Sequence, residues 1–344
     1  TSTLHVESED GIHFGDKEEI ISFEKYPEDF TCHIRDPKVW KKNNRYYMIL
    51  GGRLKEDKGA VLVYGSEDMK DWKLDRVITT PEAFGYMWEC PDYFELDGQK
   101  FLSVSPQGLK REEYRFQNIY QSGYFPVKED ESVDTEDFRE WDMGFDFYAP
   151  QTFVDDKGRR ILIGWMGIPD ADYTNPTEEA GWQHALTIPR ELSVRDGKLI
   201  QEPIEELKQL RSEDKAVCTF CYGQTIIMQN AIYEAVVDFK RCREMVMTLR
   251  EGITLSYKDN ILTLNLGVYG SGRSTRKVRL EKLEHLQIFA DTSSLEIFVN
   301  HGEEVFTTRI YNHYGRLLIN GECSGIMTVY PLKSFEIEGG RHEE

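Results

Sequence analysis

The sequence predicts an all-β protein in which a β-propeller is followed by a β-sandwich. A strand and turn unit that begins at a proline recurs along residues 37–200. Beyond residue 212, short alternating apolar stretches are separated by polar turns such as residues 258–260 and 300–302, a pattern typical of a sandwich. Aromatic residues form 12% of the chain, which suits packing between sheets.

The repeat becomes visible when the chain is aligned on Pro37, Pro91, Pro150 and Pro189. Each proline is followed by strand residues, a polar turn and a second strand. Hairpins that recur about every 40–50 residues are typical of propeller blades, which are four-stranded sheets around a central channel. The strand that opens each unit is then the innermost one, so the residues just before each proline should converge on the channel.

The predicted units follow one another along the chain. Their boundaries are 1–34 for an incomplete first blade, 35–80, 88–140 and 141–188 for three more, with a last unit at Pro189. We therefore assign residues 1–202 to the propeller.

Two further segments complete the predicted organisation. Ile204, Leu207 and Leu210 recur every three residues, so residues 203–211 are expected to form a short helical linker. Residues 212–344 are assigned to the sandwich, which contains no obvious pair of acids and is expected to serve in packing.

Residues 88–94 carry the strongest functional signal. Glu89 directly follows Trp88, and the indole is expected to desolvate the carboxyl partly, which favours a bound proton. Asp36 lies just before Pro37, and Glu89 lies just before Pro91. The carboxyls of Asp36 and Glu89 should therefore face one funnel. Two such carboxyls predict a catalytic site.

The same alignment on the prolines predicts the positions of two residues in the unit that begins near Pro150. Tyr148 lies two residues before Pro150, which is the offset of Glu89 from Pro91, so it should face the same funnel. Asp146 lies four residues before Pro150 and is expected farther out, on the rim.

Composition excludes several classes of partner. The formal net charge is −19, which argues against binding to a nucleic-acid backbone or an anionic membrane and suits a neutral or locally guided substrate. No apolar run approaches the ~18 residues of a membrane span. The six cysteines suit reduced thiols in a cytoplasmic protein, and the pair Cys218 and Cys221 lacks a second pair for zinc. We expect no metal and no cofactor.

Four segments together resemble glycoside hydrolase family 32, the β-fructofuranosidases. They are residues 35–37, 88–92, 144–151 and 188–192, and residues 291–300 are similar to the sandwich domain of that family. The resemblance implies a five-bladed propeller, incomplete in its first blade here, and retaining hydrolysis of terminal β-D-fructofuranosides. The family includes invertases, sucrose-6-phosphate hydrolases and fructan hydrolases. Residues 118–124 are most similar to the sucrose-6-phosphate hydrolase branch.

The resemblance also implies roles for individual residues. Glu89 matches the general acid/base, and Asp36 matches the residue that stabilises the transition state by holding fructose hydroxyls. The expected substrate-binding residues, which line or flank the pocket, are Arg35, Trp88, Tyr148 and Trp165.

The sequence departs from the family at the nucleophile. That family carries it in a motif similar to Asn-Asp-Pro-Asn-Gly near its N-terminus, and no such motif occurs here. We expect a sequence that lacks part of the N-terminal region, so residues 1–344 alone should show no fructosidase activity. A natural homologue that binds sugar without turnover and a propeller glycosidase acting on pentosides are the alternatives. Sucrose, sucrose 6-phosphate and fructan remain open as substrates, as does a homodimer.

Overall fold

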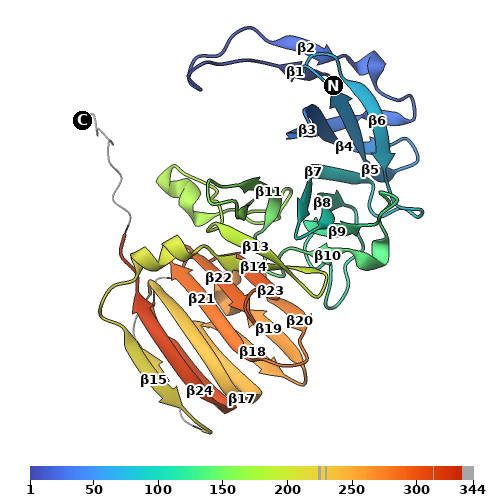
Figure 1. Ribbon diagram of the computed structural model, residues 1–344. Coiled ribbons are helices and arrows are strands. Elements are labelled where there is room, and N and C mark those ends of the chain that lie inside the picture. The colour runs from blue at the N-terminus through green and yellow to red at the C-terminus, as the bar shows by residue number, and fades with distance from the viewer. Residues whose placement is uncertain (224–225, 229–230, 313, 335–344) are drawn as a thin grey trace. The chain divides into compact units, whose positions relative to one another are not determined.

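The computed structural model describes residues 1–223, 226–228, 231–312 and 314–334. Across these residues the regular elements are β-strands and short 3₁₀ helices, so the predicted all-β class is confirmed (Figure 1). None of the described helices is long and apolar enough to span a membrane. The 3₁₀ helices are η1 (Phe23–Lys25), η2 (Thr135–Asp137), η3 (Pro176–Ala180), η4 (Glu205–Leu210) and η5 (Gly267–Gly270).

The chain divides into two compact units. Unit 1 comprises Thr1–Asp142, Phe147–Ala171 and Ser193–Lys198, and unit 2 comprises Met143–Asp146, Asp172–Leu192 and Leu199–Glu344. All the residues predicted to form the site fall in unit 1, namely Arg35, Asp36, Trp88, Glu89, Tyr148 and Trp165.

Three four-stranded sheets follow the strand order of the chain, which is the topology of a propeller blade. The first contains β3 (Phe30–Lys42), β4 (Arg45–Leu54), β5 (Lys58–Ser66) and β6 (Lys73–Ile78). The second contains β7 (Met87–Leu96), β8 (Gln99–Gln107), β9 (Gly123–Val127) and β10 (Arg139–Glu140). The third contains β11 (Tyr148–Val154), β12 (Arg160–Trp165), β13 (Arg190–Arg195) and β14 (Lys198–Pro203). A separate pair, β1 (Thr3–His5) and β2 (Glu18–Ile21), precedes them.

The hairpin after Pro189 is not a blade of its own, so the prediction of four repeat units is corrected to three sheets. Its strands β13 and β14 form the outer half of the third sheet, beside β12. Between β12 and β13 the chain forms loops and η3 rather than two further strands. The hairpin therefore supplies the strands that the unit beginning at Pro150 lacks.

The first strand of each sheet carries a β-bulge at its proline. The ladder register shifts between Arg35 and Lys38 in the first sheet, and at the matching positions of the other two. The residue before each proline has a positive φ, with values of 61° at Asp36, 47° at Cys90 and 50° at Ala149. Proline cannot donate to the ladder, and a bulge absorbs the unpaired residue while it re-aims its neighbours. The three inner strands therefore present equivalent side chains in the same way.

A glycine lets the first sheet approach the segment that carries Glu89. A Cβ atom added at Gly51 of β4 would lie 2.2 Å from the carbonyl oxygen of Trp88. No side chain fits there, so β4 and β7 pack backbone to backbone. The indole of Trp88 then fills the core formed with Phe84 and Phe125.

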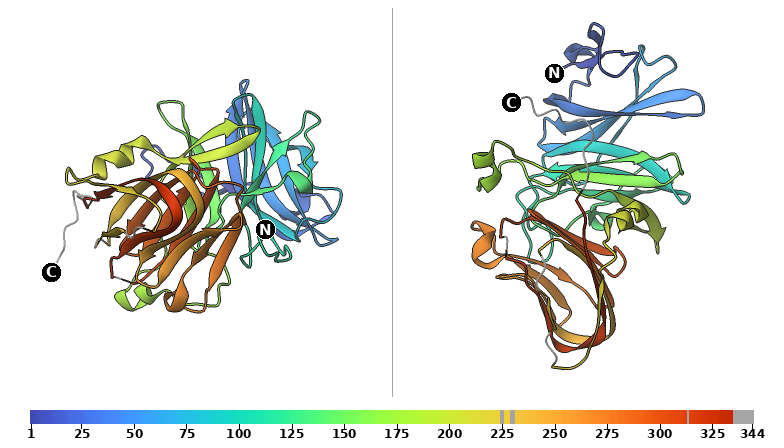
Figure 2. Two further views of the ribbon diagram at one scale, coloured as in Figure 1. Left: turned by 90° about the horizontal axis from the view of Figure 1, so that it is seen from below. Right: turned by 90° about the vertical axis from the view of Figure 1, so that its left-hand side faces the viewer.

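Unit 2 consists mainly of a ten-stranded antiparallel assembly around one hydrophobic core. Its strands are β15 (Ala216–Phe220), β16 (Ile226–Met228), β17 (Tyr233–Arg250), β18 (Ile253–Lys258), β19 (Ile261–Asn265), β20 (Thr275–Arg279), β21 (His285–Asp291), β22 (Ser294–Val299), β23 (Glu304–Arg309) and β24 (Leu317–Pro331). Strand β17 pairs with β24 on one edge, and on the other with β21 in its first half and β18 in its second. These long strands curve strongly (Figure 2).

The predicted linker, residues 203–211, contains the 3₁₀ helix η4. Its Leu207 is buried against Phe298 and Phe289 within unit 2. The spacing of apolar residues thus marked a helical turn, and the described helix is 3₁₀ rather than α.

A fully buried arginine anchors the segment 188–192 within unit 2. Arg190 is 0% exposed and pairs with Glu296 at 2.8 Å. Its guanidinium also donates to Gln201 and Thr307, and the other oxygen of Glu296 accepts the backbone N–H of Ile188. Arg190, in a segment that resembled a family motif, therefore has a structural role.

Arg190→Met is expected to destabilise unit 2 by about 3–5 kcal/mol, because it leaves the Glu296 carboxylate buried without its counter-charge. Urea unfolding measures the change. Arg195→Met is the matched control, since Arg195 is exposed on the same strand and the substitution should cost no more than about 0.5 kcal/mol. Equal losses of unfolding free energy in the two variants would show that the buried Arg190–Glu296 pair contributes no more to stability than an exposed arginine.

Asp146 is also buried, and its expected position on the rim is wrong. The side chain is 0% exposed and forms an ion pair with Arg273 within unit 2. It also accepts the hydroxyl of Thr308 at 3.1 Å and the backbone N–H of Arg309 at 2.8 Å. Asp146 is thus committed to holding unit 2 together.

Candidate active site

The carboxylate of Glu89 lies where the first strands of the three sheets meet. The guanidinium of Arg35 donates to Oε1 through Nε at 2.9 Å and Nη2 at 2.6 Å, and the hydroxyl of Tyr148 donates to Oε2 at 2.7 Å. Each of the three residues lies two positions before its proline. The repeated bulge therefore brings together residues from three sheets and fixes both oxygens of Glu89.

The carboxylate of Asp36 is held next to Glu89 in the chain, at Cys90. Its Oδ2 accepts the backbone N–H of Cys90 at 2.9 Å, so it is held by the residue that follows Glu89. The thiol of Cys90 lies 3.6 Å from the same oxygen. Asp36 and Cys90 are equivalent positions in the repeat, and both have a positive φ.

Burial determines the protonation of two neighbours. It raises the pKa of the Tyr148 phenol well above its usual range, and the negative charge of Glu89 and the hydrogen bond to it raise this pKa further. Burial likewise raises the pKa of the Cys90 thiol, with the charges of Asp36 and Glu89 adding to it. Tyr148 therefore acts as a hydrogen-bond donor, and Cys90 stays a thiol at neutral pH and is a poor nucleophile.

The two tryptophans have different surroundings. Trp88 is 0% exposed, and its indole N–H donates to the carbonyl of Phe84 at 2.7 Å. Neighbouring side chains on a strand point to opposite faces, so the indole lies in the core while Glu89 contacts Arg35 and Tyr148. The expectation that this indole desolvates the Glu89 carboxyl is therefore corrected. Trp165 is half-buried on β12 and is the ladder partner of Tyr148, so both side chains face the same way.

Three residues near Tyr148 were not predicted from the sequence as site residues. Gln107 donates a hydrogen bond to the Tyr148 hydroxyl. The ring of Tyr120 lies 6.2 Å from that of Tyr148, and its hydroxyl donates to Asp170 at 2.8 Å. The available signal was the segment 118–124, which contains Tyr120. Gln107 and Asp170 had no signal, because their place depends on packing between strands and loops.

A polar layer lies just beyond the prolines and ties the same three strands together. Asp92 is 1% exposed and accepts the backbone N–H and the hydroxyl of Thr152, both at 2.8 Å. Lys38 donates to Asp92 at 3.4 Å and to the side chain of Gln151 at 3.1 Å. Gln151 in turn donates to the carbonyl of Cys90 at 3.2 Å. Asp92 is thus held by Thr152 and Lys38.

Comparison with known families agrees with this arrangement. Residues 2–203 match the model of the glycosyl hydrolases family 32 N-terminal domain, and residues 212–329 match that of the family 32 C-terminal domain. The chain belongs to glycosyl hydrolase family 32. The β-fructofuranosidase resemblance of the sequence motifs is thereby confirmed at the level of the family.

Relatives within family 32 include sucrose-6-phosphate hydrolases. That of Bacillus subtilis is 37% identical over 334 residues, which cover 92% of this chain and 69% of the relative. That of Staphylococcus xylosus is 38% identical, with coverage of 91% and 67%. The chain therefore spans about two thirds of the length of these relatives.

Solved family 32 structures show the same fold. The structure of a sucrose-6-phosphate hydrolase from Lactobacillus gasseri superposes with a TM-score of 0.85 at 25% identity, covering 97% of this chain and 72% of that one. A variant of the Bombyx mori β-fructofuranosidase in complex with sucrose gives a TM-score of 0.79 at 30% identity, with coverage of 96% and 72%.

Proposed function

We propose that this chain serves in the hydrolysis of terminal β-D-fructofuranosides, with sucrose or sucrose 6-phosphate as the substrate. The observation that carries the proposal is the carboxylate of Glu89, held at both oxygens by Arg35 and Tyr148, with the carboxylate of Asp36 beside it. The names of the family 32 relatives support sucrose 6-phosphate, and the sucrose complex of the Bombyx mori enzyme supports sucrose.

In the proposed mechanism Glu89 is the general acid and base. It protonates the glycosidic oxygen as the bond to the fructosyl carbon breaks, and it later takes a proton from the water that releases fructose. Tyr148 and Arg35 orient its two oxygens. Asp36 holds hydroxyls of the fructosyl ring as positive charge develops on it. Arg35, Tyr148 and Trp165 are proposed to contact the sugar, whereas Trp88 acts through the core that supports Glu89.

Retention also requires a carboxylate nucleophile about 5–5.5 Å from the acid. The sequence has no Asn-Asp-Pro motif to supply it. Asp92 is committed to Thr152 and Lys38, and the Cys90 thiol stays protonated. This observation favours a second candidate function for residues 1–344, namely binding of a fructoside without turnover.

Residues 1–344 alone are therefore expected to bind fructose or sucrose in calorimetry and to release no fructose from sucrose or sucrose 6-phosphate. The physical reason is that Glu89 and Asp36 both have other roles, and we identify no further carboxylate for attack on the anomeric carbon among the described residues around Glu89. Fructose release is measured enzymatically, and Arg35→Gln is the control for binding at this site, because Arg35 is proposed to contact the sugar. Hydrolysis at the rate of an ordinary glycosidase would contradict the expectation and would imply another nucleophile.

The substrate class is tested separately, in an active enzyme that contains this chain. Release of fructose from sucrose, sucrose 6-phosphate and inulin is compared with release of arabinose or xylose from pentosides. Preference for a fructoside supports the proposal, and its kcat/KM ranking identifies the substrate. Release of pentose alone would replace the proposal with a pentosidase function.

A further inference from the structure

A cavity lies in unit 1 next to the polar layer of Lys38 and Asp92. It has a volume of about 310 Å³ and is lined by the parts of β3 and β7 that follow their prolines, with contributions from β8 and β12. Lys38 and Asp92, which form the polar layer, are also at its edge. The cavity is therefore separate from the carboxylates of the proposed active site.

The lining is strongly basic although the chain is acidic. Five cationic side chains line it, Lys38, Lys41, Lys42, Lys100 and Arg160, against two carboxylates, Asp92 and Glu95. The whole chain has a formal net charge of −19. Such a concentration of positive charge in a cavity focuses the potential and favours an anionic ligand.

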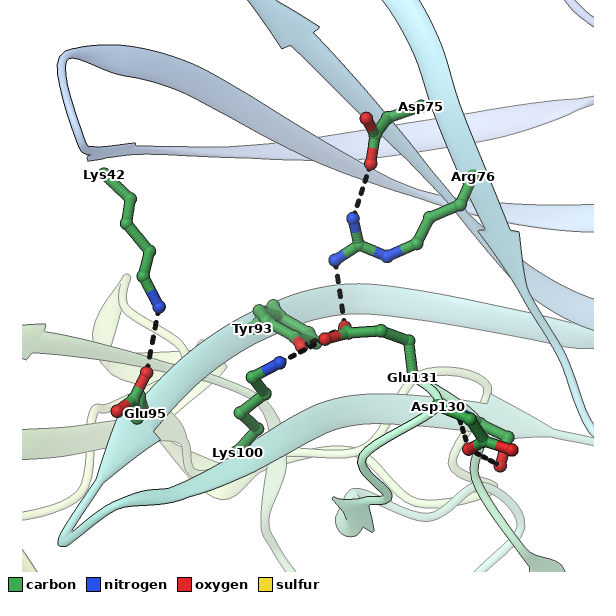
Figure 3. A network of polar contacts seen from close by, with 9 residues as sticks. Lys42, Asp75, Arg76, Tyr93, Glu95, Lys100, Asp130 and Glu131 are labelled. Atoms are coloured by element: carbon green, nitrogen blue, oxygen red, sulfur yellow. Dashed lines mark hydrogen bonds and ion pairs between the residues drawn. The ribbon is translucent and has the colours of Figure 1, made fainter.

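Three of these cations are already neutralised by the protein. Lys38 pairs with Asp92, Lys42 with Glu95 at 3.0 Å, and Lys100 with the carboxylate of Glu131. Figure 3 shows Lys42 reaching Glu95, and Lys100 reaching Glu131, whose carboxylate also pairs with Arg76.

Lys41 and Arg160 are the remaining two, and neither forms a direct ion pair among the residues that the structure describes. The charge of Asp92, which pairs with Lys38, also acts on Arg160. Lys41 donates to the hydroxyl of Tyr46 at 3.3 Å. Arg160 donates to Thr152 through Nη1 at 2.9 Å and stacks 4.6 Å from the ring of Phe94. Its buried Nε has no hydrogen-bond partner in the described part of the chain. The cavity thus has about two positive charges to spare.

The aromatic side chains of the cavity give no stacking surface for a sugar. Trp40 is stacked between Tyr47, at 5.5 Å between ring centroids, and Tyr93, at 5.7 Å. Both faces of the indole are therefore occupied. Recognition in this cavity has to come from charge and hydrogen bonds rather than from an apolar ring face.

We propose that this cavity binds a phosphate oxyanion, either as inorganic phosphate or as the phosphate group of a small phosphomonoester. A phosphate carries about −1.5 to −2 charges at neutral pH, which matches the surplus on Lys41 and Arg160. Guanidinium and ammonium groups are the usual ligands of phosphate oxygens. The volume reaches the lower end of the roughly 300–1,000 Å³ of small-molecule sites, so a phosphorylated monosaccharide fits as well as the ion.

The test is calorimetric titration of residues 1–344 with sodium phosphate, glucose 6-phosphate or glucose, at constant ionic strength set with sodium chloride. We expect saturable binding of the two phosphates with a Kd on the order of 1–10 mM, and none of glucose. Lys41→Gln and Arg160→Gln should each weaken phosphate binding by about tenfold, because each removes a charge-assisted contact. Tighter binding of glucose 6-phosphate than of inorganic phosphate assigns the phosphomonoester, and equal binding assigns the ion.

The matched control is Lys73→Gln, which removes the same charge from an exposed lysine at another cavity and should leave binding unchanged. Lys41 is exposed, so its variant tests the proposal even where Arg160→Gln unfolds the protein. The proposal is overturned by the absence of saturable binding at roughly 10 mM phosphate, or by equal losses in the Lys41 and Lys73 variants. Loss of binding in Arg35→Gln with none in Lys41→Gln would also overturn it, since the anion would then lie beside Glu89.

Discussion

Glu89→Gln, made in an active fructosidase that contains this chain, should lower kcat for sucrose by roughly 10²–10⁴-fold. Glutamine has nearly the shape of glutamate and can still meet Arg35 or Tyr148 at one atom, but it has no proton to give to the leaving oxygen. Glucose is a poor leaving group without that proton. The loss should therefore appear in kcat, measured from initial rates of fructose release.

A substrate with a good leaving group distinguishes the acid role from a merely structural one. An aryl fructoside needs little protonation at its glycosidic oxygen, so the variant should lose much less activity in the first step. Glu95→Gln is the control, because Glu95 is half-exposed on the same strand and pairs with Lys42 at the surface. Equal losses on sucrose and on the aryl fructoside would remove Glu89 from the acid role.

Asp36→Asn is the second large effect that we expect, a loss of roughly 10²–10³-fold in kcat with a much smaller change in KM. The negative charge of Asp36 matters most when positive charge has developed on the fructosyl ring, so its removal weakens the transition state more than the bound substrate. Asparagine keeps an oxygen for the backbone N–H of Cys90, so the local structure should survive. Steady-state kinetics separate the two parameters.

The control for Asp36→Asn has to be an aspartate with the same left-handed backbone conformation. Asp97 is an exposed aspartate with φ of 50° in the turn after β7, close to the 61° of Asp36, and asparagine is tolerated in this left-handed region. Asp97→Asn should leave both parameters unchanged. A rise in KM alone in the Asp36 variant would make Asp36 an ordinary binding residue.

Several features of the site could be predicted because they arise from local covalent chemistry. A proline interrupts the ladder wherever it stands in a strand, so recurring prolines at Pro37, Pro91 and Pro150 mark recurring bulges. Equal offsets from those prolines placed Glu89 and Tyr148 together, and their side chains meet at 2.7 Å.

Other features could not be predicted because neighbours in sequence are not neighbours in space. Trp88 and Glu89 are adjacent in the chain, yet the pleat of β7 sends one into the core and the other to Arg35. Asp146 is two residues from Tyr148 and belongs to the polar interior of unit 2. The hairpin after Pro189 resembles an inner pair, and only its place beside β12 shows that it is an outer one.

The sequence by itself determined the all-β class and the family, because composition, proline spacing and short motifs are local properties of the chain. Only the tertiary structure decided that the Arg35 guanidinium and the Tyr148 hydroxyl donate hydrogen bonds to the two oxygens of Glu89. Arg35 lies 54 residues before it and Tyr148 lies 59 residues after it, and they meet because the first strands of three sheets converge. Contacts across such separations depend on how whole sheets pack, and that packing minimises the free energy of the folded chain rather than of any one segment.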